Sequence, residues 1–76
     1  MAEADLILRL VRPLTETEWQ GMAREMARLA GVRAVHPVGE RQGRLLHVRY
    51  DPACLAPSGI GSAAGERGYP ARVAAL

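Results

Sequence analysis

The stretch Leu-Thr-Glu-Thr-Glu-Trp at residues 14–19 marks where a helix begins, and the rest of the fold can be built outward from it. Thr15 and Glu18 have the spacing of a capping box. In that motif the threonine hydroxyl accepts from the amide of Glu18, and the glutamate carboxylate accepts from the amide of Thr15. Leu14 and Trp19 occupy the positions of a hydrophobic staple. We therefore predict a helix that starts directly after Thr15.

Apolar residues at helical spacing extend this helix to about Ala30 and give it one apolar face. Gly31 then supplies a stop, because glycine adopts the left-handed conformation that commonly ends helices. Met22 and Met26 lie on the apolar face, so we interpret them as core side chains rather than thioether ligands. The members of the face are Trp19, Met22, Ala23, Met26, Leu29 and Ala30.

The remaining elements follow from shorter patterns. The apolar run at residues 6–11 predicts a strand, and residues 32–38 and 45–50 predict two more, joined by a loop at 39–43. A glycine-rich helix is expected from Pro57 until Gly68, then a last strand at 71–76. This βαββαβ order, with right-handed crossovers, predicts an α+β ferredoxin-like fold, a four-stranded antiparallel sheet with two helices on one face. We expect a single domain over residues 1–76.

Composition narrows the classes of function. The single cysteine excludes an internal disulfide and any thiolate cluster within one chain. The net charge is +2, and the basic residues, all arginine, are scattered rather than gathered in a block. No segment resembles a signal peptide or is long enough to span a bilayer. We expect a cytoplasmic protein with no nucleic-acid partner and no membrane insertion.

Three segments, taken in order, resemble the heavy-metal-associated (HMA) domain family. They are Leu-Ala-Gly-Val-Arg-Ala-Val at 29–35, Val-Arg-Tyr-Asp-Pro at 48–52 and Gly-Tyr-Pro-Ala at 68–71. The resemblance extends over about residues 6–76. It implies the family's ferredoxin-like fold and a place in a metal-transport or metal-homeostasis system.

The metal motif of that family, GM-x-C-x-x-C, should precede the first helix. Counting back from residues 31–32 without gaps places its cysteines on Thr15 and Glu18. The resemblance therefore implies a degenerate member in which the two halves of a capping box replace the cysteine pair. A hydroxyl and a carboxylate do not suit soft Cu(I), which prefers sulfur ligands. We expect no cofactor and no metal at this position.

Three other residues remain as weak candidates for a Zn or Cu ligand. Cys54 belongs to the loop after the third strand, at the opposite end of the domain from Thr15, and is interpreted as a structural or incidental thiol. His36 and His47 are expected to face each other across the second and third strands, on the open face of the sheet. Two imidazoles alone make a poor zinc site. Solvated histidines are the favoured interpretation, and metal delivery by these unusual ligands is the alternative.

The open face of the sheet is the predicted interaction surface, for a protein partner or for a second copy of the chain. An apolar patch with a polar rim is typical of such surfaces, although dispersed exposure remains open. The face lacks the outward aromatic residues on which RNA-binding sheets stack bases. The predicted surface comprises Ile7, Arg9, Val11, Val38, Leu45 and Arg49.

Catalysis is not expected. An acylphosphatase-like reaction on this fold would need an asparagine and a phosphate loop, but the chain contains no asparagine and no glycine-rich loop follows the first strand. No Ser-His-Asp or Cys-His arrangement is apparent. The predicted function is that of a non-enzymatic interaction or accessory module.

Overall fold

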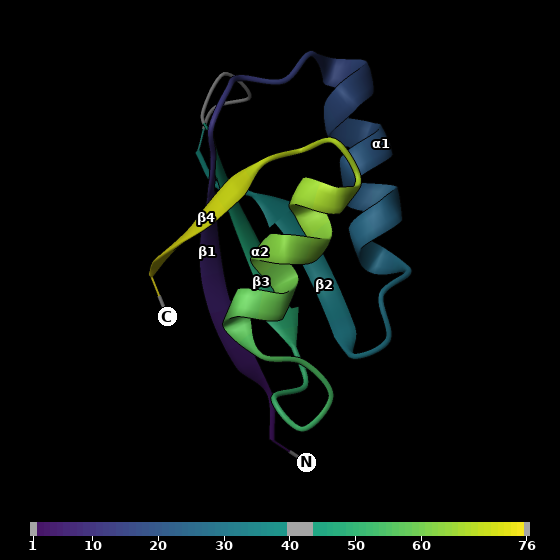
Figure 1. Ribbon diagram of the computed structural model, residues 1–76, viewed down its shortest axis with the longest axis vertical. Coiled ribbons are helices and arrows are strands. Elements are labelled where there is room, and N and C mark those ends of the chain that lie inside the picture. The colour runs from purple at the N-terminus through teal and green to yellow at the C-terminus, as the bar shows by residue number, and fades with distance from the viewer. Residues whose placement is uncertain (1, 40–43, 76) are drawn as a thin grey trace.

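The computed structural model describes residues 2–39 and 44–75 and has the predicted βαββαβ order. The sheet order is β2-β3-β1-β4, and every neighbouring pair is antiparallel. Both helices cover the same face of the sheet, and the other face is open (Figure 1). The ferredoxin-like fold class is therefore confirmed. The elements are β1 (Ala4–Leu10), α1 (Glu16–Ala27), β2 (Val32–Pro37), β3 (Leu45–Tyr50), α2 (Pro57–Glu66) and β4 (Ala71–Ala75).

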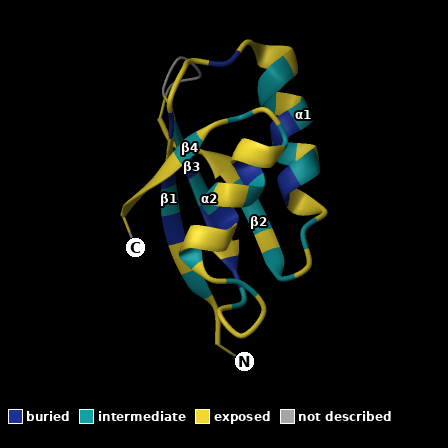
Figure 2. Cartoon of the chain, viewed as in Figure 1, coloured by how far each residue is buried: buried dark blue, intermediate teal, exposed yellow. Residues whose placement is uncertain are grey.

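The core lies between the helices and the sheet. Alternate side chains of β1 and β3 are buried, as the period of two along a strand requires. In Figure 2 the outward surface of α2 is exposed, whereas the buried residues lie between the helices and the sheet. Full burial of each large aliphatic side chain contributes roughly 1.5–3 kcal/mol. The most deeply buried residues are Leu6, Leu8, Leu10, Met22, Met26, Leu46, Val48, Ile60 and Ala64.

The end of α1 differs from the prediction. The helix stops at Ala27 rather than near Ala30. Beyond it the main chain changes to tighter turns, in which the amides of Arg28 and Leu29 donate to carbonyl oxygens three residues earlier, at 3.2 and 3.1 Å. Leu29 still packs against the core, but Ala30 is exposed. The helical spacing of apolar residues thus continues past the residue at which the helix ends.

Both ends of β1 and the end of β2 also need correction. β1 begins at Ala4, two residues before the predicted start, and ends at Leu10, so Val11 lies outside it. β2 ends at Pro37, which leaves Val38 outside that strand. β4 ends at Ala75. Most of the predicted loop at 39–43, and Leu76 of the predicted last strand, lie outside the described residues.

Gly31 is required both for its backbone and for its lack of a side chain. Its φ of +95° lies in the left-handed region, and its carbonyl accepts from the amide of Asp51 at 2.7 Å. A Cβ atom at this position would lie 2.7 Å from the Cβ of Cys54. The turn after α1 therefore packs directly against the turn after β3.

We expect Gly31→Ala to lower the free energy of unfolding by about 2–3 kcal/mol. The left-handed backbone accounts for about 1–2 kcal/mol and the forced contact with Cys54 for about 1 kcal/mol more. Urea denaturation followed by circular dichroism measures the change. Gly68→Ala is the matched control, since Gly68 has a φ of +88° but open space around its Cα. Equal losses in the two variants would contradict the role assigned to the Cys54 contact.

Candidate functional site

The capping box at the start of α1 is formed as predicted. The amide of Glu18 donates to Thr15 Oγ1 at 3.2 Å, and the amide of Thr15 donates to Glu18 Oε1 at 3.1 Å. Thr15 has the extended backbone of an N-cap, with φ −68° and ψ 166°. Leu14 is buried and Trp19 packs against the core at this end of the helix, as expected for the staple positions.

Arg12 completes this cluster, and sequence reasoning missed it. Its Nη2 donates to Glu18 Oε2 at 2.8 Å, so both carboxylate oxygens of Glu18 have a donor. The bond from Arg12, followed by the bond from the Thr15 amide, lowers the pKa of Glu18 to about 2. The same contact with Glu18 raises the pKa of Arg12. Glu18 is thus held as a carboxylate by the groups around it.

This donor set does not fit a soft metal ion. The Thr15 hydroxyl accepts from a helix amide, and the Glu18 carboxylate is shared between a second amide and a guanidinium. Neither residue offers a thiolate or a thioether, which Cu(I) prefers. Binding a metal here would also break the bonds that begin α1 and bring the cation beside Arg12.

Cys54 lies at the other end of the domain, as predicted. β1 and β3 are antiparallel, with Tyr50 opposite Ala4, so the turn after β3 lies beside the start of β1, whereas α1 follows its end (Figure 1). The thiol is exposed, and its Sγ donates to Asp51 Oδ2 at 3.7 Å. Cys54 therefore cannot share a ligand set with Thr15 in one molecule.

The predicted pairing of His36 with His47 across β2 and β3 is confirmed. His47 is not merely solvated, however: its Nε2 lies 3.1 Å from Asp5 Oδ1, in a bond that the imidazole N–H donates to the carboxylate. The described residues contain no group of three or more His, Cys, Asp or Glu side chains that could hold a metal ion. Asp5 therefore acts as a hydrogen-bond partner of His47.

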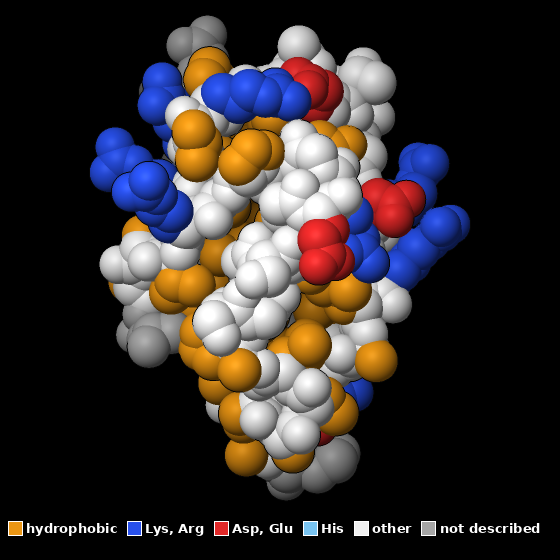
Figure 3. All heavy atoms as spheres, in the orientation of Figure 1, with side chains coloured by type: hydrophobic (Ala, Val, Ile, Leu, Met, Phe, Trp, Pro, Cys, Tyr) orange, Lys and Arg blue, Asp and Glu red, His pale blue; other side chains and the backbone are white. Residues whose placement is uncertain are grey.

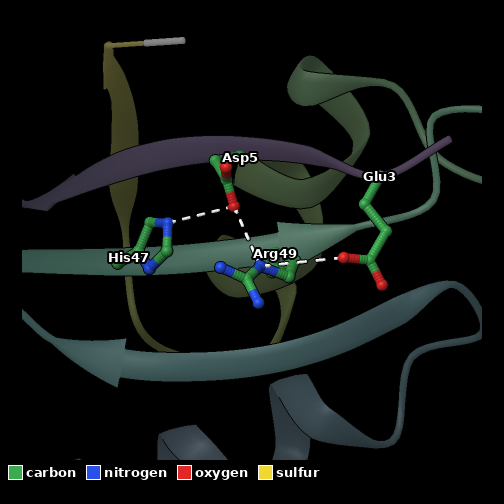
Figure 4. Close-up of polar contacts among 4 residues, drawn as sticks. All are labelled: Glu3, Asp5, His47 and Arg49. Atoms are coloured by element: carbon green, nitrogen blue, oxygen red, sulfur yellow. Dashed lines mark hydrogen bonds and ion pairs between the residues drawn. The ribbon is translucent and has the colours of Figure 1, made fainter.

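A charge network extends from this bond across the open face. Arg49 Nε lies 3.3 Å from Asp5 Oδ1 and 3.9 Å from Glu3 Oε2 (Figure 4). The prediction missed both carboxylates because it began the first strand at Leu6. Once the strand begins at Ala4, the period of two places Asp5 on the open face, opposite Arg49.

The other predicted surface residues divide into two groups. Ile7 and Arg9 lie on the open face of β1 and pair with His47 and Leu45 of β3. Val11 and Val38 follow strand ends instead, and their exposed fractions are 56% and 36%. The structure thus brings the predicted residues onto or beside one face, and this placement alone does not assign them a function.

Solved structures of small metal-binding domains share this fold. The copper binding domain from HMA7, a P-type ATPase, matches with a TM-score of 0.83 and 13% identity over 93% of each chain. The CopZ metallochaperone matches with a TM-score of 0.77 and 17% identity over 91% of this chain and all of its own. The chain has the fold of heavy-metal-associated domains.

Oxidized MerP from Ralstonia metallidurans CH34 has the same HMA-type fold, with a TM-score of 0.83 and 19% identity over 96% of this chain and 99% of its own. Neither protein-family models nor curated protein sequences match the chain. Among the described residues, no helix has both the length and the apolarity needed to cross a membrane.

The lowered pKa of Glu18 predicts a pH dependence of stability. A carboxylate whose pKa is about 2 when folded and about 4.3 when unfolded stabilises the fold above pH 4.3, and this contribution is lost as the pH falls through 2. We expect the stability advantage of the wild type over Glu18→Gln to shrink between about pH 4.5 and pH 2.

Urea denaturation at a series of pH values tests this expectation. Glu66→Gln is the control, since Glu66 has no ion pair among the described residues, and its difference from the wild type should change less over the same range. A difference between wild type and Glu18→Gln that stays constant down to pH 2 would contradict the assignment.

Proposed function

We propose that this chain is a non-enzymatic accessory module of a metal-transport or metal-homeostasis system, acting through protein contacts rather than through a thiolate metal site. The proposed link to metal transport or homeostasis is supported by the fold that the chain shares with the HMA7 copper binding domain and the CopZ metallochaperone. The capping box of Thr15 and Glu18 carries the proposal.

Metal binding and helix capping would need the same short segment. The resemblance assigns the family's cysteine positions to Thr15 and Glu18, and both side chains are engaged in starting α1. An N-cap of this kind contributes about 1 kcal/mol to stability. The segment therefore has a structural use here that does not depend on a metal, as expected for a degenerate member of the family.

The open face of the sheet is the proposed contact surface, for a partner protein or for a second copy of the chain. Half-buried Ile7 and Leu45 supply apolar side chains to this face, and Arg9 and Arg49 supply guanidinium groups. Arginine is enriched in protein interfaces, and an apolar patch with a polar rim is typical of interaction surfaces. Val11 and Val38 extend the surface past the ends of β1 and β2.

A Cu(I) titration tests the proposal. We expect the wild type to show no stoichiometric Cu(I) binding with a dissociation constant below about 1 μM, since it lacks the sulfur pair. Thr15→Cys with Glu18→Cys creates that pair at the start of α1 and should raise Cu(I) affinity at least about 100-fold. Competition with a chromogenic Cu(I) chelator measures the affinity, and native mass spectrometry measures the metal and subunit stoichiometry.

Two controls make this test specific. Thr15→Ala with Glu18→Ala removes the cap without adding sulfur, and should gain no affinity. Cys54→Ala, introduced into the double-cysteine variant, shows whether the exposed native thiol takes part. Stoichiometric, submicromolar binding of Cu(I) by the wild type would overturn the proposal.

The alternative function is metal delivery through unusual ligands, and the pairing of His36 with His47 favours it. On that alternative the wild type binds Zn²⁺ or Cu²⁺, and His36→Ala with His47→Ala abolishes the binding. Under the proposed function neither ion binds stoichiometrically at micromolar concentration. Isothermal titration calorimetry of the wild type and the double variant distinguishes the two, with Cys54→Ala as a control that retains both imidazoles.

A further inference from the structure

A hollow of about 310 Å³ lies where the end of β1 meets β4 and the residue before β3. Arg9 and Val11 come from the end of β1, Arg72 from β4, and Arg44 directly precedes β3. The lining residues are Arg9, Leu10, Val11, Arg44 and Arg72. Three guanidinium side chains thus surround one concavity, and none of its lining residues is acidic.

The main chain around the hollow is fixed by hydrogen bonds. The amide of Leu10 donates to the carbonyl of Arg44 at 2.6 Å, and the amide of Val11 donates to the carbonyl of Pro70 at 2.9 Å. Arg44 Nη1 in turn donates to the carbonyl of Val11 at 3.4 Å. The three segments that carry the arginines are therefore held together before any ligand arrives, which lowers the entropic cost of binding.

The positive charges at this corner are not neutralised by any described residue. Arg9 and Arg72 are direct cross-strand partners, and like charges at such positions repel each other. Neither these residues nor Arg44 forms an ion pair with a carboxylate in the described part of the chain. Elsewhere ion pairs are common: the described arginines with a carboxylate partner are Arg12, Arg28, Arg33, Arg49 and Arg67.

The surface view agrees with this contrast. In Figure 3, the arginine side chains along the upper left edge, on the side where β1 and β4 lie in Figure 1, have no acidic side chain beside them on the visible face. Those on the right edge alternate with Asp and Glu side chains. Uncompensated positive charge is thus concentrated on the β1–β4 side of this view.

We propose that Arg9, Arg44 and Arg72 form a binding site for a small multivalent oxyanion of the phosphate class. Guanidinium groups donate paired hydrogen bonds to phosphate oxygens, and such charge-assisted bonds are stronger than neutral ones. A bound anion would also relieve the repulsion between Arg9 and Arg72. The inference does not rest on the proposed function, because it uses neither the capping box nor a metal, although Arg9 and Val11 also belong to the proposed contact surface.

A small anion fits this surface better than an acidic protein segment does. Arg9, Arg44 and Arg72 surround a single hollow instead of forming a stripe. The other end of the open face carries Asp5 and Glu3. An acidic segment lying along the sheet would therefore meet carboxylates there, whereas a small anion contacts only the basic corner.

Titration of the ¹⁵N-labelled full chain with pyrophosphate tests the proposal. We expect saturable shifts of the backbone amides of Arg9, Val11 and Arg72. Arg9→Gln and Arg72→Gln should each weaken binding at least about fivefold, because each removes a charged donor from an exposed site. Arg24→Gln is the matched control, since Arg24 also lacks a described ion pair but lies on α1, and it should leave the affinity unchanged.

The outcomes decide the proposal in either direction. Absence of saturation, or equal weakening by Arg24→Gln, overturns it. A parallel titration with hexaglutamate tests whether the site instead binds an acidic protein segment. If this peptide binds more tightly than pyrophosphate, and the same arginine variants lose that binding, the anion-site proposal is overturned in favour of protein docking. Urea denaturation confirms that each variant is folded, and removing one member of a repelling pair should not reduce stability.

Discussion

The reciprocal hydrogen bonds between Thr15 and Glu18 determine where α1 begins, and the packing of α1 on the sheet depends on that start. One turn later the helix places Met22, and then Met26, in the core cluster that also contains side chains of β1 and β3. Arg12 holds the same glutamate from outside the helix. The two side chains of the cap are therefore committed to starting a helix, so the segment cannot also serve as a soft-metal site without losing that start.

The open face of the sheet is electrostatically divided along β1. At the start of this strand Asp5 and Glu3 contact Arg49, and Asp5 also accepts a hydrogen bond from His47, whereas at its end Arg9 faces another arginine across the ladder to β4. The charged side chains at the start of β1 thus have described partners of opposite charge, whereas its end carries a like-charge contact with no described carboxylate beside it.

The sequence by itself determined the element order, the helix start and the side of the sheet that is buried. These features follow from local physical rules: a capping box involves residues three apart, and strand alternation fixes which side chains share a face. β3 was predicted with its observed bounds, and Met22 and Met26 were correctly placed in the core. The pairing of His36 with His47 followed from the register of a single hairpin.

Only the tertiary structure decided which charged groups meet, because residues distant in sequence become neighbours through the sheet. Asp5 contacts His47 only because β1 lies beside β3, and Arg72 faces Arg9 only because β4 pairs with the other edge of β1. The close packing of Gly31 against Cys54 is also a tertiary feature, since it joins the turn after α1 to the turn after β3. Local propensity thus specified the elements, whereas strand order, which no local pattern encodes, determined the chemistry of the surface.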